Sequence, residues 1–249
     1  MNNLALLSRI YFAFCARFAP VRHLIYRMKL KYFLIFAATL FLSGCSYYAP
    51  ESHASWPGED GAVTYRTEVT AVVTVRRAED GTVFFRYGKL ELLPDGWYGF
   101  THTQRALGQL VLYPERLGNY YRCSVEWLEP LEEGGYPEAP AGASDDGVDV
   151  LTNSWITGVE DGYLTIHYNT WWGRKPLHHD FYLKADGDPM CLRLIHDAHS
   201  DERYEQGEGV VCFDISSLAG DGPLTLKWRG TDGTERTTAF EFTSAGQPE

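Results

Sequence analysis

Short runs of alternating apolar and polar residues recur through most of the chain, and they constrain its fold more than any other feature. Turn-forming residues separate the runs, as Glu79-Asp80-Gly81 does between two of them. A period of two places one side of a β-strand against a core, whereas an amphipathic helix needs a period near 3.6. Because no long segment after residue 61 follows the helical period, the sequence predicts an all-β fold.

The alternation in residues 62–132 predicts a small barrel. The apolar positions of this segment fall into the runs Val69 to Val75, Val83 to Tyr87, Leu110 to Leu112 and Tyr121 to Trp127. Four or five strands in roughly 70 residues match the size of an OB-like barrel. Cys123 alternates with apolar neighbours in the last run, so we expect it to be a buried thiol.

The second half of the chain predicts a β-sandwich. Residues 133–147 are rich in Gly, Pro, Ala and Asp and are predicted to be a linker between two domains. Beyond them, in residues 148–245, seven strand candidates lie near 148–153, 162–170, 178–184, 190–196, 209–215, 223–229 and 236–243. Their spacing is typical of an immunoglobulin-like seven-strand sandwich, in which two antiparallel sheets bury the apolar sides of the strands.

The first 44 residues are predicted to be a lipoprotein leader, and translation is expected to start at Met28. Two lysines precede an apolar run from Tyr32 to Leu42, which is too short to span a bilayer as a mature helix. The run ends in Leu42-Ser43-Gly44-Cys45, which resembles the lipobox of bacterial lipoproteins. We therefore expect acylation at Cys45, followed by a tether over residues 45–61.

The charge of the chain argues against nucleic acid as a partner. The leader holds six of the 22 Lys and Arg and none of the 33 Asp and Glu, which leaves 16 basic and 33 acidic residues, a formal charge of −17. Binding to phosphates needs Lys and Arg to displace counterions, so an acidic body is unsuited to nucleic acid or to an anionic membrane surface. The expected attachment to the membrane is the lipid anchor alone.

The order and spacing of several tracts resemble the NigD-like lipoproteins. The tracts that carry the resemblance are Trp155-Ile156, Gly162 to Ile166, His179 to Leu183, Leu192 to Ala198 and Gly209 to Leu218. The resemblance implies a bacterial envelope lipoprotein with an OB domain followed by an immunoglobulin-like sandwich. It implies no established activity and no catalytic residues. The family name derives from a gene in a bacteriocin cluster, so a bacteriocin-associated or immunity function is one alternative.

Aromatic pairs are the main candidates for contact with a ligand or partner. Trp171 and Trp172 fall at the predicted turn between two sandwich strands, and Trp97 and Tyr98 lie in the predicted barrel. Aromatic side chains at loop tips can stack on sugar rings or anchor a protein partner. The other interpretation is that they cap a domain core, and we expect this for at least one of the two tryptophans.

The tract from Leu194 to Leu218 raises the question of a metal or acid–base site. His196, His199 and Asp201 offer ligands that zinc accepts, but the tract lacks a strong metal motif such as HExxH. We therefore expect no metal and no cofactor, and we expect His196 to hydrogen-bond the backbone of its loop. A hydrolase that uses His196 with Asp197 or Asp201 is a rival hypothesis.

Two further cysteines leave a question open. Cys191 and Cys212 lie on successive predicted strands, so either a cross-strand disulfide or two separate thiols fit the pattern. The chain also shows no GxSxG elbow and no phosphate-binding loop, which favours a protein that is not an enzyme. The expected function is binding or assembly at the outer membrane, on either of its faces, with glycan binding by loop aromatics as an alternative.

Overall fold

The computed structural model describes residues 62–96, 99–100 and 102–242 of the chain. Within this range every helix or strand is a β-strand, so the predicted all-β fold is confirmed. No helix of the described part is long and apolar enough to cross a membrane. The leader, Cys45 with its tether, and the pair Trp97 and Tyr98 lie outside the described residues, so those predictions remain predictions.

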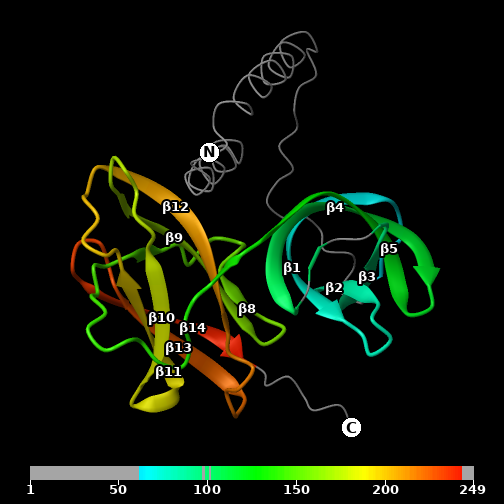
Figure 1. Cartoon of the computed structure of the whole chain (residues 1–249). Helices are drawn as coiled ribbons and strands as arrows, with labels where there is room; N and C mark the ends of the chain where they lie inside the picture. The colour runs from blue at the N-terminus through cyan, green and yellow to red at the C-terminus, as the bar shows by residue number, and fades with distance from the viewer. Residues whose placement is uncertain (1–61, 97–98, 101, 243–249) are drawn as a thin grey trace, which may run out of the picture. The chain divides into compact units, whose positions relative to one another are not determined.

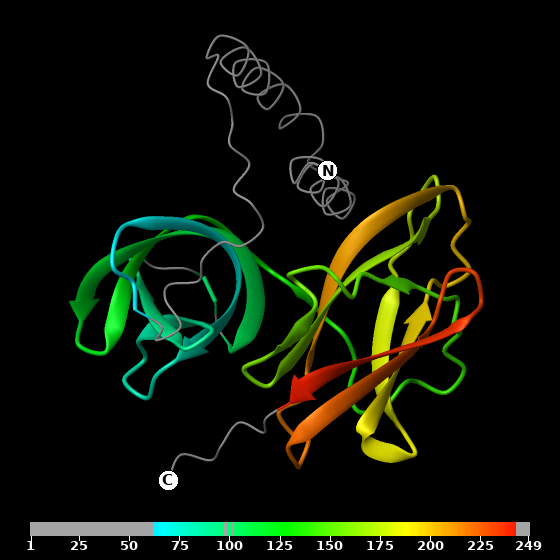
Figure 2. The same cartoon turned by 180° about the vertical axis from the view of Figure 1, so that it is seen from behind.

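The first five strands form a closed barrel, which confirms the predicted small barrel (Figures 1 and 2). They are β1 (Thr67–Arg77), β2 (Val83–Tyr87), β3 (Leu90–Pro94), β4 (Gln104–Leu117) and β5 (Tyr120–Pro130). Their order is β1-β2-β3-β5-β4, and β4 pairs back with β1 to close the sheet. The apolar positions of the alternation point inward, and Phe85, Leu92 and Leu110 are fully buried.

The predicted buried thiol of the barrel is also present. Cys123 is fully buried in β5 among the apolar side chains of the barrel core. Burial raises the pKa of the Cys123 thiol to about 12, because a thiolate would be desolvated there. The side chain therefore stays a neutral thiol at any physiological pH and acts as a small apolar residue.

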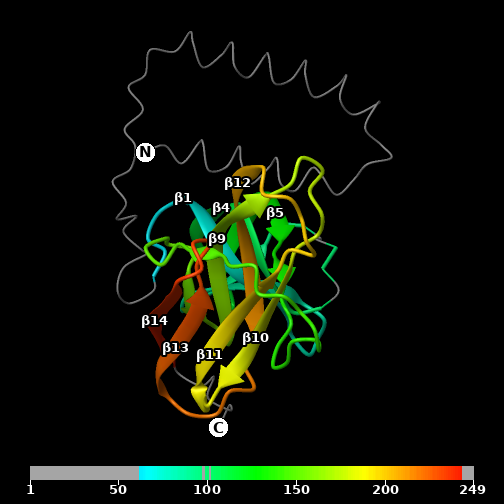
Figure 3. The ribbon, with the colours of Figure 1, turned by 90° about the vertical axis from the view of Figure 1, so that its left-hand side faces the viewer.

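The remaining strands form two packed sheets (Figure 3). One sheet has four strands in the order β10-β11-β13-β14, namely Asp180–Asp186, Asp188–Asp197, Gly222–Arg229 and Glu235–Phe242. The other has five strands: β6 (Glu132–Glu133), β12 (Glu205–Asp214), β9 (Tyr163–Trp172) and β7 (Asp149–Val150) in this order, with β8 (Gly158–Glu160) also paired with β9. All seven predicted strands are present, together with the short β6 and β8.

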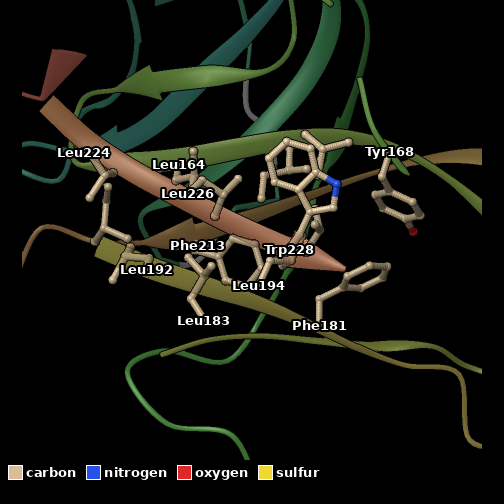
Figure 4. Packing of buried hydrophobic residues seen from close by; sticks show 14 of the residues in the cluster. Leu164, Tyr168, Phe181, Leu183, Leu192, Leu194, Phe213, Leu224, Leu226 and Trp228 are labelled. Carbon is tan, nitrogen blue, oxygen red and sulfur yellow. The ribbon is translucent and has the colours of Figure 1, made fainter. Parts of the chain in front are cut away.

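The core of the sandwich lies between the two sheets (Figure 4). The five-stranded sheet contributes Leu164, Tyr168 and Phe213, and the facing sheet contributes residues such as Leu183, Leu194 and Trp228. These residues are the apolar members of the alternating pattern in the sequence. Complete burial of such a side chain stabilises the fold by about 1.5–3 kcal/mol.

The start of the predicted linker is hydrogen-bonded to both sheets. β6 pairs in parallel with β12, and the Gly134 N–H donates to the Cys212 carbonyl at 2.8 Å. The next residue, Gly135, donates to the Phe181 carbonyl at 2.8 Å, across in the other sheet. A β-carbon on Gly134 would collide with the ring of Phe213, so glycine is needed for this close passage.

Of the two possibilities for Cys191 and Cys212, the structure shows two separate thiols. β11 pairs with β10 and β13, whereas β12 pairs with β9 and β6, so the two strands that carry these cysteines lie in different sheets. The connection between them crosses from one sheet to the other instead of forming a hairpin. Cys191 and Cys212 are free thiols in the structure.

Ion pairs join the barrel and the sandwich within one compact unit, Pro57–Glu249. Asp161, at the turn between β8 and β9, accepts two hydrogen bonds from Arg76 of β1, at 2.9 and 2.7 Å, and one from Arg86 of β2 at 3.3 Å. Its side chain is only 5% exposed. Nearby, the buried Arg105 donates to Glu160 at 2.8 Å. Two carboxylates of one turn thus hold three arginines of the barrel.

Candidate functional site at the loop end of the sandwich

Two connections cross between the sheets at the same end of the sandwich, and we call this region the loop end. Residues 173–179 connect β9 to β10, and residues 198–204 connect β11 to β12. Strand pairing brings the connections together, because Trp172 pairs with Glu205 and Phe181 pairs with His196. The histidine-containing tract that raised the question of chemistry is therefore part of this region.

A buried chain of hydrogen bonds runs through the loop end. The Gly147 carbonyl lies 2.8 Å from Nδ1 of His196, and Nε2 of His196 lies 3.0 Å from Nδ1 of His179. Nε2 of His179 then lies 3.3 Å from Oδ2 of Asp201. His179 and His196 are 2% and 1% exposed, so this histidine chain is shielded from water. His196 thus contacts a backbone carbonyl, but it is that of Gly147, in the segment before β7, and not that of its own loop as expected.

The histidine chain has one proton fewer than its three contacts need. A carbonyl only accepts, so Nδ1 of His196 carries a proton and its Nε2 accepts from Nδ1 of His179. When both imidazoles are neutral, Nε2 of His179 has no proton to offer the Asp201 carboxylate, which also only accepts. The third contact therefore becomes a hydrogen bond only when the chain takes up a proton.

Burial opposes that uptake. Burial is the main cause that lowers the pKa of His196 to about 4; the Gly147 carbonyl acts against this shift, and the neighbouring His179 adds to it. Burial also lowers the pKa of His179, although the carboxylate of Asp201 acts in the opposite direction. At neutral pH both imidazoles are therefore neutral, and the contact between His179 and Asp201 lacks its proton.

Asp201 also ties the two connections together. Its Oδ2 accepts from the N–H groups of Gly173 at 2.9 Å and Leu177 at 3.2 Å, and its Oδ1 accepts from Glu202 at 2.9 Å. A β-carbon on Gly173 would collide with this carboxylate, which explains the glycine. Burial acts to raise the pKa of Asp201, but the backbone hydrogen bonds outweigh it and the pKa is lowered. The carboxylate is therefore ionised and holds both connections in place.

Trp171 and Trp172 are the last two residues of β9 and do not form the predicted turn, because their pairing with Gln206 and Glu205 extends the strand. The Trp172 ring stacks on His179 with centroids 4.1 Å apart, and its Nε1 donates to the Gly207 carbonyl at 3.3 Å. Trp172 packs against the sandwich core. Of the two proposed roles, its surroundings fit that of a core cap.

The three candidate metal ligands take separate partners. His196 and Asp201 are used as described above, while His199 lies 2.7 Å from Asp180, whose hydrogen bond raises the pKa of that exposed imidazole. No group of three or more His, Cys, Asp or Glu side chains in the described range is arranged to hold a metal ion. His179 joins this site because it lies two residues before Phe181, and Phe181 pairs with His196.

The outer surface of the loop end carries exposed apolar groups. Leu177 is 48% exposed and Tyr204 is 54% exposed, and the guanidinium of Arg174 lies 4.4 Å above the Tyr204 ring. The two segments that present these groups are the ones that Asp201 fixes by backbone hydrogen bonds. We call Arg174, Leu177 and Tyr204 the loop-end surface.

A polar pocket adjoins the other end of the histidine chain. It has a volume of about 300 Å³ and is lined by Asp145, Asp146, Arg203, Arg229 and the turn 230–233. Asp146 immediately precedes Gly147, whose carbonyl ends the chain, and its carboxylate accepts from the Ala198 N–H at 2.9 Å. The pocket and the chain thus share the segment around Asp146.

Residues 136–242 match the sequence model of the NigD-like C-terminal beta sandwich domain. A search of curated proteins finds no match. Among solved structures, a protein from Parabacteroides distasonis whose name calls it toxin-related aligns with a TM-score of 0.60 and 23% identity, over 72% of this chain and 95% of that one. A protein of unknown function from Bacteroides vulgatus aligns with a TM-score of 0.57 and 14% identity, over 72% and 93% of the two chains.

A third solved structure, from Bacteroides fragilis and named as a candidate lipoprotein, aligns with a TM-score of 0.50 and 14% identity, over 72% of this chain and all of that one. At these identities the structural matches concern the fold, which extends over the barrel and the sandwich. The sequence match at 136–242 concerns the family. Residues 136–242 are therefore similar to the C-terminal β-sandwich domain of the NigD-like family, which agrees with the resemblance seen in the sequence.

Proposed function

We propose that this protein is an acylated lipoprotein of the cell envelope, anchored in the outer membrane through Cys45, and that it binds a partner without catalysing a reaction on it. The anchor rests on the sequence from Lys29 to Cys45, with its basic start, its short apolar run and its lipobox. A single acyl chain binds a membrane only weakly, so stable anchoring needs more than one chain on the cysteine.

The loop-end surface is the proposed contact with the partner. The carboxylate of Asp201 holds both segments, so Leu177 and Tyr204 are presented without a large ordering cost on binding. Tyrosine and arginine are residue types that dominate the energy of protein interfaces. A protein partner is therefore favoured over a glycan, because the stacked and half-buried Trp172 is a poor platform for a sugar ring.

Membrane fractionation tests the anchor. The full chain is expressed in a host that processes lipoproteins, beside Cys45→Ala and the control Cys191→Ala. We expect the native chain and the control to sediment with outer membranes and to incorporate labelled palmitate. Cys45→Ala should be soluble and unlabelled. Sedimentation of Cys45→Ala with the membranes to the native extent would rule out the lipid anchor.

Crosslinking tests the contact. A photoreactive amino acid placed at Tyr204 should capture one protein from envelope extracts, and the same group at exposed Tyr65 of the barrel is the control. In a second experiment the photoreactive group is placed at the neighbouring position Leu177. There the change Tyr204→Ala should weaken capture by about tenfold or more, which corresponds to a loss of binding free energy above about 1 kcal/mol. Equal capture from positions 204 and 65 would exclude the loop-end surface, and binding of glycans alone on an array would favour the glycan alternative.

A further inference from the structure

A second buried histidine lies on the other side of the five-stranded sheet, away from the core. His167 of β9 is 3% exposed, and its Nδ1 lies 2.8 Å from Oγ of Ser154. Its Nε2 lies 3.4 Å from Oε2 of Glu208, on the neighbouring strand β12. Serine, imidazole and carboxylate therefore follow one another in a line, although the three residues are far apart in the sequence.

Backbone contacts fix this arrangement. The turn 151–157 folds over His167, because the Leu151 N–H donates to the His167 carbonyl at 2.9 Å and the His167 N–H donates to Thr157 Oγ1 at 3.0 Å. Within the turn, the Thr157 N–H donates to the Ser154 carbonyl at 3.1 Å. On the other side, β9 and β12 are paired throughout, with Val210 opposite His167. The serine is thus held by the turn, and the carboxylate by the sheet.

The groups at the two ends of the line, Glu208 and Ser154, determine which nitrogen of His167 carries the proton. A carboxylate only accepts, so Nε2 of His167 carries the ring proton toward Glu208, and Nδ1 is left with a lone pair. The Ser154 hydroxyl then donates to Nδ1. Burial lowers the pKa of His167, with Glu208 acting against it, so the imidazole is neutral at neutral pH. A neutral imidazole whose protons are placed in this way can remove the proton of a serine hydroxyl.

One observation distinguishes this line from an ordinary satisfied hydrogen-bond network. Nε2 of His167 and Oε2 of Glu208 are buried and, among the described residues, neither completes a well-aligned hydrogen bond. Such atoms cost stability and recur at functional sites, where a contact tightens only during the reaction. The Ile156 N–H donates to Ser154 Oγ at 3.3 Å and helps to hold that oxygen in the turn.

Access to the site comes from the turn. Ser154 is only partly buried, whereas His167 behind it is almost fully buried. The next residue, Trp155, is 57% exposed, so this part of the turn faces solvent. The solvent-facing side of the turn is therefore the route by which a small ester would reach Ser154.

We propose that Ser154, His167 and Glu208 are the nucleophile, general base and positioning carboxylate of a second site, which hydrolyses small carboxylic esters. Ser154 Oγ bonds to the ester carbonyl carbon, the serine proton moves to Nδ1 of His167, and the bond to the leaving alcohol breaks as that alcohol takes the proton. Water then attacks the acyl-serine through the same base, and the acid leaves as the proton returns to Oγ. This activity goes beyond the partner binding proposed above and is independent of it.

A fluorophosphonate probe tests the nucleophile on the full acylated chain in detergent. Ser154 Oγ displaces fluoride from phosphorus, so mass spectrometry should find one adduct, on Ser154, that forms much faster on the native than on the urea-denatured chain. Ser154→Ala should give no adduct. The matched control is Ser216→Ala, because Ser216 Oγ donates to the Asp214 carboxylate at 2.6 Å and has no imidazole partner. This control should label at the native rate.

Two further variants test the assigned roles with the probe and with p-nitrophenyl acetate. His167→Asn should slow both reactions at least about 100-fold, the lower range for loss of a general base. Glu208→Gln should lower kcat about tenfold and leave KM unchanged, since it acts through His167. Circular dichroism checks that each variant is folded. The proposal fails if native and denatured chains label equally, or if folded His167→Asn labels Ser154 at the native rate.

Discussion

The imidazole of His196 is almost completely buried, so the cost of charging it falls on the folded state alone. Its pKa is about 4 in the folded protein and 6.5 in the unfolded chain. At pH values between these two, the unfolded chain binds more protons than the folded protein does. The free energy of unfolding therefore falls as the pH falls through this window, and the contribution of His196 to it is complete above pH 6.5. A pH between 5 and 6 therefore tests the histidine chain before most carboxylates titrate.

We expect the free energy of unfolding to drop by about 1 kcal/mol between pH 7.5 and 5.5 because of this group. Urea titrations at both pH values measure it. His196→Asn keeps a donor for the Gly147 carbonyl but does not titrate, so its two curves should differ less than those of the native protein. The exposed His199 acts with the opposite sign, since its pKa is raised, and the comparison cancels it. An equal pH dependence in both proteins would contradict the assignment.

The sequence alone could not predict how these side chains meet. A histidine at the end of a predicted strand indicated a backbone contact, and His196 makes one with Gly147. The partner imidazole of His179 depends on the register between β10 and β11, which places Phe181 opposite His196. Ser154 and His167 meet only because a turn folds back over β9, a long-range arrangement that no local period encodes.

At the scale of elements, the period of two predicted every long strand. Three strands were missed: β3 (Leu90–Pro94), and β6 and β8, in which two or three residues are too few for an alternation to be visible. The chain order also suggested that β11 and β12 are neighbours, whereas the connection between them crosses to the other sheet. Alternation fixes which side of a strand is buried, but not which strand lies beside it.

The glycine that follows β6 provides a test at this scale. In Gly134→Ala the new β-carbon would meet the ring of Phe213 and lie 2.8 Å from the Phe181 carbonyl oxygen. Overpacking of this kind costs about 1–3 kcal/mol, so we expect a lower urea midpoint with an unchanged slope. Gly158→Ala in β8, where a β-carbon meets nothing within 4 Å, should change stability by less than about 0.5 kcal/mol. Equal changes in stability for the two variants would show that the chain at Gly134 is not closely packed against Phe213.

At the scale of the whole molecule, Asp161 connects the barrel to the sandwich. It has a positive φ of 53°, a conformation that asparagine also tolerates, so Asp161→Asn removes charge without straining the turn. Because this carboxylate accepts three hydrogen bonds from Arg76 and Arg86, we expect a loss of about 1–2 kcal/mol.

Urea unfolding of the full chain measures the loss, with Arg66→Gln as the control. The pair of Arg66 and Glu68 is exposed, at 3.1 Å, and its removal should change stability by less than about 0.5 kcal/mol. If both variants were equally stable, the charges between barrel and sandwich would contribute no more than an ordinary surface pair.

The pairing of β6 with β12 bears on how this protein can be divided. The NigD-like domain begins at residue 136, three residues beyond the end of β6. A fragment cut at that residue would lack the strand that covers β12, and its backbone N–H and C=O groups would be open to other chains. Such a fragment would tend to self-associate along that edge, so a monomeric version of the sandwich has to start before Glu132.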